Sequence, residues 1–221
     1  MEELMENKKL FIVRILMMAA GIIILGFSIA VLKLALLGND PYTGMLFAIA
    51  DVTPISYPLW QIIFGIIFFI IQLLLGRHLI GIGTIINTFS IGYIVDFSYR
   101  FILIPAFGQP EGFPLQLLTL IIGMLICSVG ISLYQKADLG VSPYDSLSLI
   151  ADERLKKIPY FWCRIVCDGT CALVCFFLGG IVGIGTLLTA FGFGPLVSFF
   201  NKVLSDPILR AAGKKNGAAP A

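Results

Sequence analysis

The sequence matches itself when it is shifted by 102 residues. Between positions 14 and 99 this ungapped shift gives 19 identities in 86 positions. A hydrophobic composition alone does not align glycine, proline, tryptophan and threonine in the same order, so the sequence predicts a duplicated unit. The predicted parts are repeat one at about 10–100, a linker at about 101–114 and repeat two at about 115–205. The strongest matches are Gly38-x-x-Pro41-Tyr42 with Gly140-x-x-Pro143-Tyr144, Trp60 with Trp162, and Gly81-Ile82-Gly83-Thr84 with Gly183-Ile184-Gly185-Thr186.

The composition is that of a membrane protein. Hydrophobic residues make up 58% of the chain, only 13% are charged, and the mean hydropathy is +0.98. A soluble domain of this size needs more polar surface. Six charge-poor stretches are long enough to cross a hydrocarbon layer of about 30 Å, at about 12–33, 58–75, 79–97, 115–135, 159–179 and 181–200. The predicted fold is an all-α membrane protein of six transmembrane helices in one membrane domain, 1–221, in contact with the lipid bilayer.

The basic residues predict the orientation in the membrane, because cytoplasmic loops carry an excess of Lys and Arg. The N-terminal segment is basic, whereas the next loop, 38–57, has no Lys or Arg. The alternation continues along the chain and places both termini, including a flexible tail at 206–221, in the cytoplasm of a multi-pass protein of the cell (inner or plasma) membrane. The predicted cytoplasmic residues are Lys8, Lys9, Arg14, Arg77, Arg154, Lys156, Lys157, Lys202, Arg210, Lys214 and Lys215. The loop 98–114 is predicted to lie outside.

Three spans per repeat is an odd number, so the two repeats are predicted to run in opposite directions across the membrane. Inverted repeats are a recurrent plan of secondary transporters, whose binding site lies at the repeat interface near the bilayer midplane. This prediction concerns architecture, and architecture alone does not establish an activity.

A short segment follows the first span of each repeat, at 41–53 and 143–154, and is too short to cross the membrane. Asp40 and Ser142 are suitable N-caps, and each is followed by a proline, Pro41 or Pro143, at the first helical position. Asp145 lies three residues after Ser142, as in a capping box. Gly38 and Gly140 are predicted to end the preceding spans. Each segment is predicted to be a short interfacial or re-entrant helix: either a capped connector or, if it dips into the protein, a site for an anionic group.

The stretch from Ala137 to Asp145, Ala-Asp-Leu-Gly-Val-Ser-Pro-Tyr-Asp, resembles the signature of the YczE/YyaS/YitT family of bacterial integral membrane proteins. Gly81-Ile82-Gly83-Thr84-Ile85-Ile86-Asn87, followed by Gly92 and Asp96, is similar to the second recurring stretch of that family. The resemblance covers most of residues 10–205. It implies a poorly characterised membrane protein, sometimes grouped with small-molecule exporters, and it brings no established site residues.

Ionisable residues inside apolar spans are candidates for function because burying a charge is costly. Asp168 lies near the centre of the fifth span, and Arg164 precedes it by one helical turn. The two are predicted to pair, either as a neutralised structural pair or as a proton or substrate site. Asn87 lies in the middle of the third span, where it is predicted to make either an interhelical hydrogen bond or a contact with a substrate. The predicted pathway lies between the repeats and includes Asp168, Arg164, Asn87, Asp40, Tyr42, Tyr144 and Asp145.

Other polar and sulfur-containing residues receive more ordinary interpretations. Lys33 and Lys136 are predicted to extend toward the headgroups, and Asp96 to pair with Arg100. Three cytoplasmic carboxylates predict an acidic vestibule or, alternatively, a solvated loop: Asp138, Asp145 and Asp152. The cysteines at 163, 167, 171 and 175 share one helix at a spacing typical of a packing seam, and no metal is predicted.

The sequence carries no phosphate loop, dinucleotide fingerprint or nucleophile motif, so we predict no enzyme and no cofactor. Its net charge of +2 is spread over the loops and predicts no nucleic-acid partner. The favoured function is ion-coupled transport, in particular export, of a small organic molecule. One alternative is a substrate-binding membrane subunit of an energy-coupling uptake system, and another is a non-transporting accessory or scaffold protein. A homodimer is compatible with any of these.

Overall fold

The computed structural model describes residues 2–155 and 160–213. Lys156, Lys157, Lys214 and Lys215, which contribute to the predicted orientation, lie outside the described residues. The described part is helical and contains no strand. Six helices, alone or with their continuations, are long and apolar enough to cross a membrane, which confirms the predicted fold class. They are α1 (Glu2–Leu34), α3 (Tyr57–Leu75), α4 (Ile82–Phe97), α6 (Phe113–Lys136), α8 (Tyr160–Phe177) and α9 (Ile184–Phe200).

The third and sixth spans are longer than predicted because each continues through a wide turn. The π-helix η2 (Ser98–Leu103) leads from α4 into α5 (Ile104–Phe107), and the π-helix η3 (Asn201–Ser205) leads from α9 into α10 (Asp206–Gly213). Both π-helices end just before a proline, Pro105 or Pro207, which has no N–H to donate and whose ring presses on the preceding turn. The predicted loop 98–114 is therefore wrong up to residue 107, and the first part of the linker predicted at about 101–114 is helical. The predicted flexible tail is likewise helical over 206–213.

The two short helices form as predicted. They are α2 (Pro41–Val52) and α7 (Pro143–Leu155). Asp40 caps α2, because its Oδ1 accepts a hydrogen bond of 3.1 Å from the backbone N–H of Thr43. Asp145, expected in a capping box, instead receives a hydrogen bond from Arg164 of α8.

The turns before α2 and α7 share an unusual backbone conformation. Gly38 and Gly140 have φ angles of 102° and 113°, a conformation that glycine adopts at little cost. They do not end the preceding helices directly, as was predicted. Two residues earlier, Leu36 (φ 57°) and Asp138 (φ 55°) already leave the helical conformation. These two positions are equivalent under the shift of 102 residues, so both repeats use the same two-step exit from a span.

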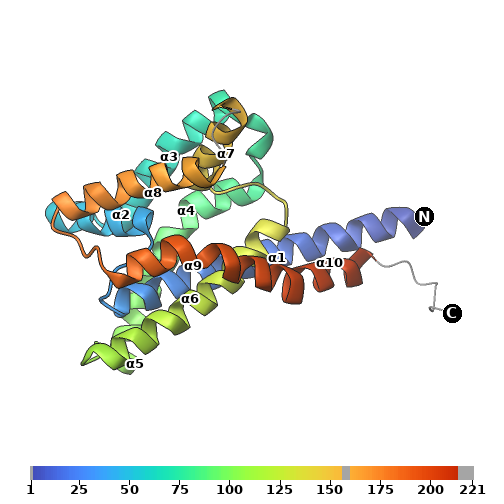
Figure 1. Ribbon diagram of the computed structural model, residues 1–221. Coiled ribbons are helices and arrows are strands. Elements are labelled where there is room, and N and C mark those ends of the chain that lie inside the picture. Colours follow the sequence, from blue (N-terminus) through green and yellow to red (C-terminus); the bar gives the residue numbers. More distant parts are fainter. Residues whose placement is uncertain (1, 156–159, 214–221) are drawn as a thin grey trace.

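The centre of the molecule is the long contact between α1 and α6, which cross it side by side (Figure 1). Glycine allows the close approach. A Cβ atom on Gly21 would lie 2.6 Å from the backbone nitrogen of Tyr134, and one on Gly123 would lie 3.3 Å from that of Leu32. Gly21 and Gly123 are equivalent positions, and so are Leu32 and Tyr134. The central contact is therefore made twice, with the roles of the repeats exchanged.

The outer helices follow the same exchange. Helix α4 packs on α1 and α9 packs on α6, while α2 lies against α8 and α7 against α3. The loops interlock in the same way: the N–H of Gly83 donates to the carbonyl of Leu139, and the N–H of Gly185 donates to that of Leu37, both at 2.8 Å. Each repeat thus closes the irregular backbone of the other. The antiparallel orientation of the repeats in a membrane stays a prediction.

The outward surface is strongly apolar. Large hydrophobic side chains are exposed along all six long helices, and Phe107 and Phe177 are 75% and 80% exposed. In a soluble monomer such a continuous surface marks an interaction site. On helices of this length it is the surface that a membrane protein presents to lipid.

Candidate functional site

An ion-paired group of side chains joins α7 to α8. Arg164 donates from Nε to Oδ2 of Asp168 at 3.0 Å and from Nη1 to Oδ1 of Asp145. The i, i+4 pair predicted from the sequence is confirmed. The second pair, with Asp145, was not predicted, because the two residues lie 19 positions apart on different helices. We call Asp145, Arg164, Asp168 and Tyr144 the charge cluster; its two carboxylates and one guanidinium leave one formal negative charge in excess.

Tyr144 connects the charge cluster to the first repeat. Its hydroxyl donates a hydrogen bond of 2.5 Å to Oδ1 of Asp168, and the Arg164 guanidinium lies 5.1 Å from the centre of its ring. The ring stacks on Tyr42, with centroids 4.3 Å apart and planes inclined by 7°. Tyr42 and Tyr144 are the same position of the two repeats, so the duplicated loops meet directly beside Asp168. All three side chains are buried, at 5–8% exposure.

The structure places the other predicted pathway residues differently. Asp40 lies within electrostatic range of Asp168 and Arg164, although it bonds to neither. Asn87 is buried on α4 and approaches the Tyr134 hydroxyl of α6. No hydrogen bond links Asn87 to the charge cluster within the described ranges. The predicted pathway residues are therefore brought together around α2, α7 and α8, with Asn87 apart from them.

Burial also acts on the acid–base behaviour of the two short helices. It raises the pKa of the Asp40 carboxyl above its ordinary value, and the Asp168 carboxylate adds to this, whereas the bond from Thr43 and the Arg164 charge oppose it. Burial raises the pKa of the Tyr144 hydroxyl as well, and the Asp168 carboxylate raises it further. Tyr144 is therefore a hydrogen-bond donor to Asp168 throughout the physiological pH range.

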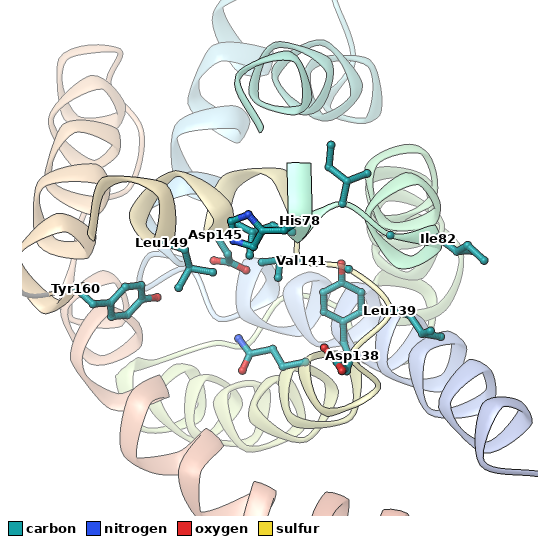
Figure 2. A pocket seen from close by; sticks show the side chains of 14 residues that line it. His78, Ile82, Asp138, Leu139, Val141, Asp145, Leu149 and Tyr160 are labelled. Carbon is teal, nitrogen blue, oxygen red and sulfur yellow. The ribbon is translucent and has the colours of Figure 1, made fainter. Parts of the chain in front are cut away.

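A cavity of about 580 Å³ opens beside the charge cluster, and we call it the α7 cavity. Figure 2 shows Tyr160 and Leu149 on one side of it, Asp138 and Leu139 on the other, and Asp145 between them. Because Asp145 belongs to both, the cavity reaches the charge cluster. The full lining is His78, Leu79, Ile80, Gly81, Ile82, Tyr134, Gln135, Asp138, Leu139, Gly140, Val141, Asp145, Leu149 and Tyr160.

A second, smaller cavity of about 200 Å³ lies against α2, and we call it the α2 cavity. Of its thirteen lining residues, six are the counterparts, 102 residues earlier, of residues that line the α7 cavity, and two, Gly180 and Ile181, are counterparts 102 residues later. Lys33, Leu36, Gly38, Asn39 and Phe47 correspond in this way to Gln135, Asp138, Gly140, Val141 and Leu149. The equivalent loops of the two repeats therefore each line a cavity, and the two cavities differ in size.

Several secondary predictions can be compared with the structure. The Asp96–Arg100 pair forms at 2.8 Å. Lys136 pairs with Asp206 at 2.7 Å, and Lys33 lies 4.1 Å from the centre of the Phe47 ring. Both lysines thus have protein partners, and their contact with the headgroups stays a prediction.

The carboxylates and cysteines of repeat two also take defined places. Asp138 and Asp145 line the α7 cavity, as an acidic vestibule requires, whereas Asp152 is not part of its lining. The cysteine side of α8 is turned inward, with Cys171 and Cys175 in the central hydrophobic core. Among the described residues, no group of three or more His, Cys, Asp and Glu could hold a metal ion.

The carboxylates of the charge cluster can take up and release a proton. Asp168 is bonded to both Tyr144 and Arg164, and a proton that reaches Asp145 through the α7 cavity competes with Arg164 for that carboxylate. Such competition is the elementary step by which a buried ion-pair network couples binding to a change in packing.

The fold and the site define a helical, polytopic membrane protein with a partly buried ion-pair cluster that reaches the larger of two related cavities. The chain belongs to the family described as "Family of unknown function (DUF6198)", whose model matches residues 12–202. The resemblance to the YczE and YyaS proteins is thereby confirmed.

Three relatives are similar over most of their length. The "Uncharacterized membrane protein YczE" of Bacillus subtilis (strain 168) is 29% identical over 81% of this chain and 81% of its own. An "Uncharacterized protein" of Haemophilus influenzae is 28% identical over 82% of this chain and 80% of its own. The "Uncharacterized protein YyaS" of Bacillus subtilis (strain 168) is 25% identical over 86% of this chain and 92% of its own. No solved structure matches the chain significantly.

Proposed function

We propose that this protein is a small ion-coupled transporter, in particular an exporter, of a small organic molecule. The observation that carries the proposal is the pair of cavities formed in part by equivalent loop residues, the larger of which is connected through Asp145 and Arg164 to the buried Asp168. An alternating-access carrier needs two vestibules that are related by its internal symmetry and separated by a closed core.

The predicted inverted repeat gives these cavities a direction. With Arg77 in the cytoplasm, the α7 cavity, which begins next to it at His78, faces the cytoplasm, and the α2 cavity, which includes Gly179 and Gly180, faces outside. The larger cytoplasmic vestibule then corresponds to a state that is open inward. In the opposite state of the transport cycle each repeat takes up the packing arrangement that the other has here, so that the α7 cavity closes and the α2 cavity widens.

Asp168 is the group proposed to carry the coupling proton. In the unprotonated state it is held by Arg164 and by the Tyr144 hydroxyl. Protonation removes one negative charge from the charge cluster and releases Arg164 toward Asp145. The Tyr144 ring, stacked on Tyr42, then transmits the change from repeat two to repeat one.

The test does not require a known substrate. Inverted vesicles that contain the protein are energised with a proton gradient and incubated with a bacterial metabolite extract, and accumulated molecules are identified by mass spectrometry. At least one small molecule should accumulate with the wild type and not with Asp168→Asn. Asp96→Asn, which removes a carboxylate from an exposed arginine pair, is the matched control and should transport normally.

The alternatives give different outcomes. Absence of accumulation under both proton and sodium gradients contradicts the proposal. If the protein also co-purifies with a fixed partner, the accessory function is favoured, and a partner pair of an ATPase and a coupling membrane protein favours the uptake subunit. Transport by Asp168→Asn with unchanged pH dependence removes the coupling role of Asp168 while keeping transport.

A further inference from the structure

We infer that the α7 cavity binds a small organic cation: an ammonium group carried on an apolar body. The inference depends on the proposed function only for its consequence, since it identifies the class of substrate that would enter the pathway. Binding itself is a property of the cavity and can be measured without transport.

The charge of the lining residues sets the sign of the ligand. Among the described lining residues, Asp138 and Asp145 are the acidic ones, and His78 is the only basic one. His78 lies 3.0 Å from a carboxylate oxygen of Glu153, outside the cavity. A ligand in this cavity therefore meets two carboxylates with no lining Lys or Arg among the described residues.

Both carboxylates keep capacity for a further donor. Asp138 receives one bond, of 3.2 Å from Arg14, and its side chain is 82% exposed. Asp145 is held by Arg164 through one oxygen, Oδ1. Since an ionised carboxylate can accept about four hydrogen bonds, an ammonium group can bind without first displacing either arginine.

A buried hydroxyl supplies an independent sign of a missing ligand. Tyr134 lines the same cavity, its side chain is only 4% exposed, and its hydroxyl has no hydrogen-bond partner of normal geometry in the described part of the chain. Leaving a buried hydroxyl without a partner costs about 1–3 kcal/mol. A ligand that fills the cavity and reaches Tyr134 removes this cost.

The rest of the wall fits an apolar body with a positive end. Leu79, Ile80, Leu139 and Leu149 contribute aliphatic surface, while the rings of Tyr134 and Tyr160 offer faces for a cation. The volume of about 580 Å³ lies within the range of small-molecule sites. A neutral molecule of the same shape would gain the apolar contacts but leave both carboxylates unused.

The test is equilibrium binding by calorimetry, with the full-length protein in maltoside micelles. Two matched probe pairs separate charge from shape: choline with 3,3-dimethylbutan-1-ol, and phenethylamine with 2-phenylethanol. We expect at least one cation to bind at least about tenfold more tightly than its neutral partner. Equal binding within each pair, or no binding of either cation at millimolar concentration, overturns the inference.

Two variants locate the site. Tyr134→Phe should weaken the binding of the cation about tenfold while leaving the thermal unfolding midpoint nearly unchanged, because the hydroxyl, although Asn87 lies near it, makes no hydrogen bond of normal geometry in the described part of the chain. Asp138→Asn should weaken it at least as much, whereas Asp96→Asn should have no effect. Unchanged affinity in both Tyr134→Phe and Asp138→Asn places any binding elsewhere and overturns the assignment.

Two further results distinguish a soluble cation from a lipid headgroup as the ligand, and the inferred cation site from the proposed transport. The same affinity in nanodiscs of phosphatidylcholine and of phosphatidylglycerol identifies a soluble ligand; competition by phosphatidylcholine identifies a lipid headgroup and overturns a soluble substrate. If a cation binds but no flux is seen in vesicles, the inferred cation site stands and the proposed transport is contradicted. If an uncharged or anionic molecule is transported and no cation binds, transport stands and the inferred cation site is contradicted.

Discussion

The two repeats share a scaffold but differ in the chemistry that it carries. Both have the glycine turn, the short helix that begins at a proline, the buried tyrosine and the exchanged loop contacts. Only repeat two has the charge cluster, because the counterparts of Asp145, Arg164 and Asp168 in repeat one are Thr43, Ile62 and Ile66. The two repeats thus share the residues that set the backbone geometry of the loops, whereas the ionisable residues of the charge cluster occur in repeat two alone.

The cavities differ in the same sense. The α7 cavity has about 580 Å³ and two carboxylates with no lysine or arginine in its described lining, while the α2 cavity has about 200 Å³ and is lined by one lysine, Lys33, and one carboxylate, Asp51. A carrier whose two vestibules have different charge holds its substrate more tightly on one side.

The largest effect is expected for Arg164→Ile, which gives repeat two the residue of repeat one at that position. Asp145 and Asp168 then face each other without their shared cation, and breaking a buried pair in this way should cost about 3 kcal/mol of unfolding free energy. Thermal unfolding in micelles is the measurement. The matched control is the conservative variant Ile62→Val at the equivalent position, which should lose less than half as much.

The triple variant Asp145→Thr, Arg164→Ile, Asp168→Ile sharpens this test, because it copies the whole of the repeat-one pattern. Apolar replacement of a complete ion-pair group is often neutral for stability, so the unfolding midpoint should return close to that of the wild type while transport stays lost. A triple variant as unstable as Arg164→Ile would mean that the charge cluster is needed for folding.

The next effect should be equal in the two repeats. Gly38→Ala and Gly140→Ala each force a side chain into a left-handed conformation, and the new Cβ would lie 2.4 Å from Thr186 Oγ1 or 2.5 Å from the Gly81 nitrogen. Each should lower the free energy of unfolding by about 2 kcal/mol. A clear difference between the two would show that the interlocked loops do not carry equal weight.

A smaller, unequal effect is expected for the stacked tyrosines. Tyr144→Phe removes a hydrogen bond to a buried carboxylate, worth about 1.5–3 kcal/mol. Tyr42→Phe keeps the same ring stack and should cost less than 1 kcal/mol, estimated roughly from the loss of one neutral hydroxyl. Chemical or thermal unfolding of the two variants measures the difference, and equal losses would contradict a special role for Tyr144.

The smallest effect concerns pH. Because burial raises the pKa of Asp40, its contribution to stability is full below the unfolded value of about 4 and is lost as the pH rises through the folded value. Asn caps a helix as well as Asp does. Asp40→Asn should therefore raise the unfolding midpoint by about 2 °C near pH 8, with the gain shrinking on acidification. A gain that grows at low pH would contradict the sign.

The sequence is sufficient to predict the spans, the short helices and the Asp168–Arg164 pair, because these depend on local patterns: apolar length, a cap followed by proline, and an i, i+4 spacing. It is also sufficient to align the two repeats. The π-helices before Pro105 and Pro207 were missed, although the two prolines are themselves equivalent under the shift of 102 residues. That equivalence was the available signal.

The contacts between repeats could not be predicted in the same way. The Asp145–Arg164 pair, the Tyr42–Tyr144 stack and the partners of Lys33 and Lys136 depend on how α2, α7 and α10 pack against distant helices. From the sequence alone, a carboxylate in a short helix is equally compatible with a helix cap, a solvated charge and an ion-pair partner. Packing decides among these, and a single sequence does not encode packing in a local pattern.

The interlocked loops have a consequence for biosynthesis. The carbonyl of Leu37 and the N–H of Gly83 find their partners, Gly185 and Leu139, only in the other half of the chain. During translation the first three helices therefore wait in the bilayer with these peptide groups unmatched, until the later half has been synthesised and inserted. The first half of the chain alone therefore lacks the partners that close these two turns, and we expect it to be less stable by itself than within the whole chain.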